Sequence, residues 1–149
     1  MIVLDTNVWS ELVRPLPSER VVAWTQRNRE DGAITSVTVA ELFYGVRLLP
    51  AGKRQDALLS RVQRLVDAAG DRLFGFDDAA ARTYRELRAD ADRRGRPMSV
   101  EDAMIAAICR THACPLATRN IKNFRYAGVE LIDPWSYEEH EGHGDNRPG

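Results

Sequence analysis

Five short apolar segments, separated by longer amphipathic stretches, constrain the fold of this chain more than any other feature of its sequence. The apolar segments are residues 2–4, 33–35, 73–76, 116–118 and 129–132. Strands that are apolar along their whole length are typical of parallel sheets covered by helices on both faces. The pattern therefore predicts an α/β domain with helices between the strands. We predict helices within residues 5–14, 18–31, 36–49, 53–69, 77–95 and 99–109.

The charge balance and the apolar content exclude several classes of protein. The chain holds 21 basic and 22 acidic side chains, so its net charge of −1 excludes a protein that coats nucleic acid by bulk charge. A local basic face stays possible. No apolar run approaches the roughly 18 residues of a membrane span, and the N-terminus lacks the basic region of a signal peptide. We expect a cytoplasmic protein that makes no membrane contact.

The sequence offers no convincing catalytic or metal-binding site made of histidine or cysteine, and no glycine-rich ligand-binding motif. Cys109 and Cys114 are too few for a disulfide framework or a metal-binding quartet, and Cys109 is expected in the core. His112 lies near a helix end. His140 and His143 could bind a metal, but two histidines in a polar tail are more simply explained as solvated side chains. The sequence has no Walker loop, dinucleotide-binding loop or nucleophile elbow. Carboxylates are the remaining candidates.

Three carboxylates lie where an α/β fold of this kind is expected to have its ligand-binding or catalytic site. Asp5 ends the first strand, Glu41 lies in the helix after the second strand, and Asp102 begins the most apolar helix. Ligands of open α/β sheets bind beside the carboxyl ends of the strands, near the point where strand order reverses. Each carboxylate also has a structural alternative: Asp5 suits a helix cap, and Glu41 and Asp102 suit capping boxes with Thr38 and Ser99.

Convergence of these carboxylates in one cleft would create a site for a hard cation. Unpaired carboxylates that lie close together must share protons or hold a cation. A ligand set of oxygens, without histidine or cysteine, selects Mg²⁺ or Mn²⁺. Such ions activate water and stabilise the charge of a phosphoryl group during transfer.

A basic segment follows the fourth strand. Between Asp102 and Glu130 the chain has no carboxylate, whereas Arg119, Lys122 and Arg125 lie just after residues 116–118. The segment is either a solvated basic loop or, beside a metal cleft, a contact surface for a phosphate backbone.

Four blocks of the sequence, in order, resemble the PIN-domain family, and among its members the VapC group of bacterial toxins with its FitB-like branch. The blocks are residues 2–7 (IVLDTN), 36–45 (SVTVAELFYG), 101–107 (EDAMIAA) and 117–124 (ATRNIKNF). The closing residues 131–135 (LIDPW) fit as well. The resemblance implies a PIN-like three-layer α/β/α sandwich with a mainly parallel five-stranded sheet. We expect this domain to span residues 1–135 and a polar tail to span residues 136–149.

The resemblance also implies a Mg²⁺- or Mn²⁺-dependent endoribonuclease, a hydrolase of RNA phosphodiester bonds that acts as the toxin of a toxin–antitoxin pair. It implies a homodimer silenced by a cognate antitoxin, with DNA contacted only through that antitoxin. Asp5, Glu41 and Asp102 would then bind the metal, and Arg119, Lys122 and Arg125 would contact the RNA backbone. Residues that would orient carboxylates, water or phosphate are Thr6, Thr118 and Asn120. Glu101 ranks behind Asp102 because helix neighbours point about 100° apart.

One position departs from the family pattern. Where family members often carry a fourth acid, this chain has Asn123, whose amide oxygen can contact a metal or water but brings no charge. We therefore expect a second metal to bind weakly.

Three alternatives stay open at this stage. One is a PIN-domain nuclease that processes RNA without being a toxin. Another, suggested by Asn123, is a catalytically weak PIN-like module that binds RNA or protein. The third is a phosphatase of the haloacid-dehalogenase type with Asp5 as nucleophile, although such enzymes need a second acid where this chain has Asn7.

Overall fold

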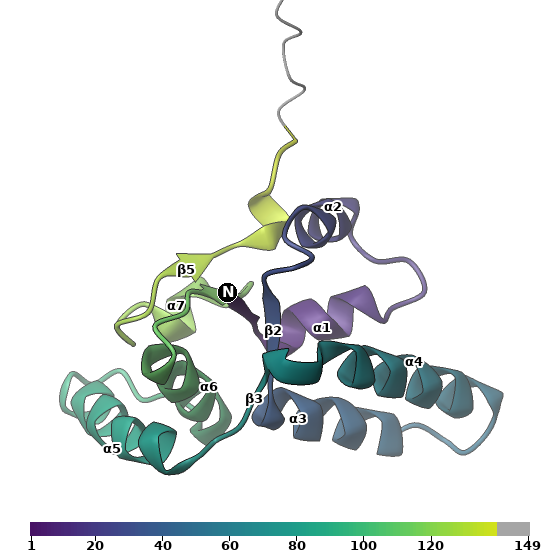
Figure 1. The fold of residues 1–149 in the computed structure, drawn as a ribbon. Helices are drawn as coiled ribbons and strands as arrows, with labels where there is room; N and C mark the ends of the chain where they lie inside the picture. The colour runs from purple at the N-terminus through teal and green to yellow at the C-terminus, as the bar shows by residue number, and fades with distance from the viewer. Residues whose placement is uncertain (140–149) are drawn as a thin grey trace, which may run out of the picture.

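The computed structural model describes residues 1–139, and a five-stranded sheet lies at its centre (Figure 1). The strands are β1 (Ile2–Leu4), β2 (Gly32–Thr35), β3 (Leu73–Phe74), β4 (Leu116–Ala117) and β5 (Leu131–Ile132). Their order is β3-β2-β1-β4-β5, and neighbouring strands are parallel throughout. The predicted α/β fold is confirmed. His140, His143 and the predicted tail beyond residue 139 lie outside the described residues.

Helices connect the strands as the amphipathic pattern predicts. Within residues 1–139 they are α1 (Thr6–Leu12), α2 (Glu19–Arg27), α3 (Ser36–Arg47), α4 (Lys53–Ala69), α5 (Asp78–Arg93), α6 (Val100–Thr111) and α7 (Ile121–Phe124). The sequence does not predict α7 or the 3₁₀ turns at Gly70–Arg72 and Pro134–Ser136. Elements of three or four residues are too short to display a helical period.

The two faces of the sheet pack against different helices (Figure 1). Val3 and Leu116 belong to a core that includes residues of α5 and α6, whereas Leu4 and Ala117 pack with α1 and α2. On β2, Ile34 packs with α3 and α4. Successive strand residues point to opposite faces, so the central strands β1 and β4 each supply both layers of core. The three-layer sandwich is confirmed.

Helix α6 anchors one candidate carboxylate. Ala103 and residues 105–109 are at most 1% exposed, so this helix is fixed deep in the core, with Cys109 inside as expected. Asp102 directly precedes this buried run. Its position is therefore set by core packing rather than by a surface loop.

The surface of the described residues has two further features. No helix within residues 1–139 is long and apolar enough to cross a membrane. On α3, Leu42 is buried, whereas Tyr44 and Leu48, the residue that follows the helix, are 66% and 67% exposed. The expected homodimer stays a prediction.

Candidate active site at the carboxyl edge of the sheet

A pocket of about 460 Å³ lies beside the carboxyl ends of β1 and β4. The chain runs outward from β1 to β2 and β3, and then returns to β4 on the other side of β1. The pocket thus lies at the point where strand order reverses, as ligand sites of open α/β sheets do. It is lined by Asp5, Thr6, Asn7, Ser10, Glu11, Arg14, Glu41, Asp102, Arg119, Asn120 and Trp135.

Asp5 is held by hydrogen bonds from two segments. Its Oδ1 accepts from the Thr6 backbone N–H at 2.8 Å, which caps α1. Its Oδ2 accepts from the Thr118 hydroxyl at 2.8 Å and from the Asn7 side-chain amide at 3.2 Å. Burial raises the pKa of Asp5 to about 6, against the hydrogen bonds from Thr118 and Thr6. Asp5 therefore caps α1, as the sequence predicts, and its carboxylate also lines the pocket.

Glu41 lies one turn inside α3 and points at Thr6. The N-cap of α3 is Thr35, whose Oγ1 accepts from the Thr38 N–H at 3.1 Å. A capping box of Thr38 and Glu41 is therefore wrong, because Thr38 is already inside the helix. Instead, the Thr6 hydroxyl donates to Glu41 Oε1 at 2.8 Å. Burial raises the pKa of Glu41, the Thr6 bond opposes that rise, and Glu101 and Asp102 add to it.

Asp102 lies in the first turn of α6. Its backbone N–H donates to the Oγ of Ser99, the cap of this helix, at 3.1 Å. Burial raises the pKa of the Asp102 carboxyl, while hydrogen bonds with the side chains of Ser99 and Asn123 lower it. Asp102 thus takes part in the cap through its backbone N–H and also lines the pocket.

The structure separates the remaining sequence candidates into two groups. Thr118 is fully buried behind Asp5, and its Oγ1 also accepts the Asn120 N–H at 3.0 Å. Arg119 lines the pocket with its guanidinium carbon 5.1 Å from the centre of the Trp135 ring. Besides Thr118, four candidates lie outside the pocket lining. Glu101 lines a neighbouring cavity together with Glu41. Lys122 and Asn123 line a third cavity, and Arg125 is exposed.

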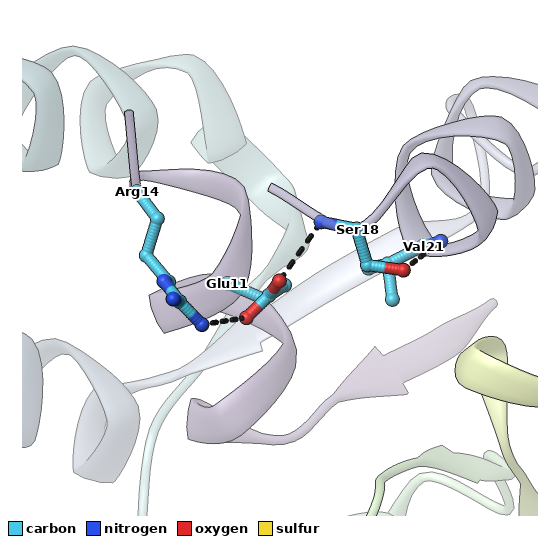
Figure 2. A network of polar contacts seen from close by, with 4 residues as sticks. All are labelled: Glu11, Arg14, Ser18 and Val21. Carbon is cyan, nitrogen blue, oxygen red and sulfur yellow. Dashed lines mark hydrogen bonds and ion pairs between the residues drawn. The ribbon is translucent and has the colours of Figure 1, made fainter. Parts of the chain in front are cut away.

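The pocket wall also contains an ion pair that sequence reasoning misses. Figure 2 shows Glu11, which is 8% exposed, with Oε2 at 3.0 Å from Arg14 Nη1. Its Oε1 accepts the Ser18 backbone N–H at 2.8 Å. In the helix that the sequence predicts within residues 5–14, the spacing of Asn7, Glu11 and Arg14 places them on one face, which is a signal in the sequence.

Charge compensation distinguishes Glu11 from the other carboxylates of the pocket. Burial raises the pKa of Glu11, but the hydrogen bonds from Ser18 and Arg14 outweigh it, so the pKa is lowered. Asp5, Glu41 and Asp102 instead receive neutral hydrogen-bond donors, and each has a raised pKa. These three form the uncompensated acidic cluster. Among residues 1–139 no group of three His, Cys, Asp or Glu side chains is arranged to hold a metal ion as it stands.

Comparison with known proteins identifies the family. The model of the PIN domain matches residues 2–129. The chain belongs to the PIN-domain family. Toxin FitB of Neisseria gonorrhoeae is 40% identical to this PIN domain over 137 residues, 91% of this chain and 99% of FitB. VapC ribonuclease Y4jK of Sinorhizobium fredii is 39% identical over 137 residues, 91% of this chain and 98% of the relative.

A solved structure gives the same assignment. A chain in the structure of FitAB bound to the IR36 DNA fragment superposes on this PIN domain with a TM-score of 0.87 and 39% identity. The match covers 94% of this chain and 99% of that chain. The chain therefore shares its fold with FitB over nearly its whole length, within the group that contains VapC ribonucleases.

The raised pKa of Asp5 predicts an unusual pH dependence of stability. Between the ordinary pKa of 3.8 and about 6, native Asp5 keeps a proton that the unfolded chain has lost. The free energy of unfolding of the metal-free protein should therefore fall as pH rises through this range and level off above it. The Asp5 contribution is at most about 3 kcal/mol.

Urea unfolding in the presence of a chelator, at several pH values, measures this effect. Asp5→Asn should flatten the fall, because the amide does not titrate. Asp78→Asn alters a carboxylate that is 81% exposed and serves as the matched control. An Asp5→Asn protein with the pH dependence of the wild type would contradict the prediction.

Proposed function

We propose that this PIN-domain protein is a divalent-metal-dependent endoribonuclease and the toxin of a toxin–antitoxin pair in the cytoplasm. The observation that carries the proposal is the cluster of Asp5, Glu41 and Asp102, three uncompensated carboxylates at the switch point of the sheet. The names of the relatives support it, since FitB is a toxin and Y4jK a VapC ribonuclease.

The donor set of the pocket suits Mg²⁺ or Mn²⁺. Asp5, Glu41 and Asp102 supply only oxygen, which these hard ions prefer. Mg²⁺ usually keeps several waters and takes one or two carboxylates directly, so the three side chains need not enclose it. When bound, the ion would activate a water molecule and offset the charge of the phosphoryl group.

The chain's own residues orient the reaction. Thr6 and Thr118 fix the carboxylates of Glu41 and Asp5 by hydrogen bonds of 2.8 Å each. Among residues 1–139, the pocket lining has no histidine, cysteine or lysine, so its carboxylates are the described groups that can accept a proton near neutral pH. Arg119 lies where its guanidinium can bind a phosphate of the RNA backbone.

Replacement of Asp5 tests this proposal. Asp5→Ala should lower metal-dependent RNA cleavage by about 100-fold or more, the order of magnitude of one catalytic group. Asp5→Asn should be similarly inactive while keeping an oxygen for the Thr6 N–H, which separates catalysis from helix capping. In urea unfolding, a divalent ion at 100 times its Kd should stabilise the wild type by about 2.7 kcal/mol, and Asp5→Asn by much less.

The same variants separate the alternatives. Full metal-stimulated cleavage by Asp5→Ala would refute the site. RNA binding without metal-stimulated cleavage by the wild type would favour a binding module. Cleavage without growth arrest on expression, in the absence of any antitoxin, would favour an RNA-processing nuclease over a toxin.

Asn123 gives a second test of the metal site. Its side chain lies close enough to lower the pKa of the Asp102 carboxyl, so Asn123→Asp would place two carboxylates near each other. We expect this variant to be less stable without metal and to bind Mn²⁺ more tightly, because the cation relieves the repulsion. Calorimetric titration with Mn²⁺ measures the change. A clear fall in affinity would contradict a metal at Asp102.

We propose that an antitoxin silences the enzyme by binding a groove that adjoins the catalytic pocket. The groove, about 410 Å³ in volume, lies between α1, α3 and α4 and has a largely apolar lining. Ser10, Arg14 and Glu41 line both the groove and the catalytic pocket. An apolar antitoxin segment in the groove would therefore reach the acidic cluster. DNA would be contacted only through the antitoxin, in line with the DNA-bound FitAB complex.

Gly45 offers a way to fill this groove. It lines the groove on α3, and a Cβ added there would have no atom within 4 Å. Gly45→Leu should therefore fold and should raise the antitoxin concentration needed for half-inhibition by about tenfold, by overpacking the bound segment. Gly45→Ala is the matched control with a single methyl group. The measurement titrates the proposed antitoxin against RNA cleavage, and unchanged inhibition of Gly45→Leu would place the antitoxin elsewhere.

A further inference from the structure

A second, basic cavity lies beside the catalytic pocket, between the loop that joins α5 to α6 and the helix α7. Its volume is about 120 Å³, and its lining includes Arg96, Lys122, Asn123 and Tyr126. Within the part of the chain that the structure describes, no carboxylate lines it. Two cations and an aromatic ring therefore form a small site of positive charge.

The cations of this cavity differ from other arginines nearby. Arg82, Arg85 and Arg94 on and beside α5 each form an ion pair with a carboxylate at 3.0 Å. Neither Arg96 nor Lys122 forms an ion pair within residues 1–139. Both side chains are exposed, so their charges are available to an anion from solvent.

Tyr126 provides a flat surface in the same cavity. It is 44% exposed, and the guanidinium carbon of Arg96 lies 4.8 Å from the centre of its ring. Tyrosine rings and guanidinium planes are the groups on which proteins stack unpaired bases of single-stranded RNA. A cation next to such a ring can also bind the adjoining phosphate.

Asn123 connects this cavity to the catalytic pocket. Its side chain lines the basic cavity, whereas Asn120, one turn earlier at the start of α7, lines the catalytic pocket. Asn123 is also close enough to the Asp102 carboxyl to lower the pKa of that group. A strand whose phosphate lies at the carboxylate cluster would therefore bring a neighbouring nucleotide to Tyr126.

We propose that this cavity is a nucleotide-binding subsite, in which Tyr126 stacks an unpaired base of the RNA and Arg96 and Lys122 bind its phosphate. The subsite rests on the proposed ribonuclease function and adds to it a contact away from the scissile bond. It accounts for a cavity near Asp102 that is lined by a half-exposed ring and by two cations without an ion pair among residues 1–139.

Equilibrium binding of labelled single-stranded RNA tests the subsite without cleavage if every variant also carries Asp5→Asn. Tyr126→Ala should weaken binding about tenfold, and Tyr126→Phe, which keeps the ring, should bind like the parent. Arg96→Ala should weaken binding and lower the slope of log affinity against log salt concentration by about 0.7. Thermal unfolding of each variant checks that it is folded.

Arg88→Ala is the matched control. Arg88 lies 5.7 Å from the centre of the Tyr84 ring on α5, a similar cation–π pair that does not line the basic cavity. This variant should bind RNA like the parent.

Specific results would overturn the subsite. Parent-like RNA binding by folded Tyr126→Ala and Arg96→Ala would do so, and so would equal losses for Tyr126→Ala and Tyr126→Phe. Loss of antitoxin binding with RNA binding retained would instead assign the cavity to an acidic protein segment. If the wild type cleaves RNA while these variants bind it normally, only the subsite fails. If the wild type neither binds nor cleaves RNA, the proposed function fails with it.

Discussion

The buried carboxylate at the end of the central strand is the constraint on which the rest of the site depends. Asp5 is 4% exposed and accepts hydrogen bonds from Thr6, Asn7 and Thr118. These donors come from the start of α1 and the end of β4, so the bonds join the two segments that border the switch point. A buried charge without a counter-charge is costly, and Asp5 is therefore stable either as the protonated acid or beside a cation. A pKa of about 6 keeps both states accessible near neutral pH.

Threonine hydroxyls order this acidic cluster without neutralising it. Thr6 donates to Glu41 and lies 2.9 Å from Thr38 Oγ1, which in turn lies 3.3 Å from Thr35 Oγ1. This chain of hydroxyls runs from α1 to the start of α3 and fixes the geometry with neutral donors. The opposite solution occurs on the pocket wall, where Arg14 compensates the charge of Glu11. The site thus contains one carboxylate with an internal structural role and three whose negative charge faces the pocket.

The sequence predicts the parts of this protein that follow from periodicity. Apolar runs and helix caps give the parallel sheet and six of the helices, and the strand-edge rule brings Asp5, Glu41 and Asp102 to one pocket. The same rule does not distinguish Arg119 from Lys122. Arg119 lines the catalytic pocket, whereas Lys122 lies on the short helix α7 and lines another cavity. The spacing of Glu11 and Arg14 indicates a shared helix face, but the hydrogen bond that fixes Glu11 depends on the turn that brings the Ser18 N–H back to it. Local sequence patterns do not show that this turn brings Ser18 next to Glu11.

The shared lining of the groove and the catalytic pocket has a consequence for how such a protein can evolve. Ser10, Arg14 and Glu41 face both spaces, so a substitution at any of them alters the two together. If the groove holds the antitoxin as proposed, a variant that evades its inhibitor through these positions also damages its own catalytic machinery. Escape is then confined to groove residues outside the shared wall, such as Gly45 and Ala57, where a compensating change in the partner can follow. Toxin and antitoxin would diverge there while the shared wall stays under selection from both.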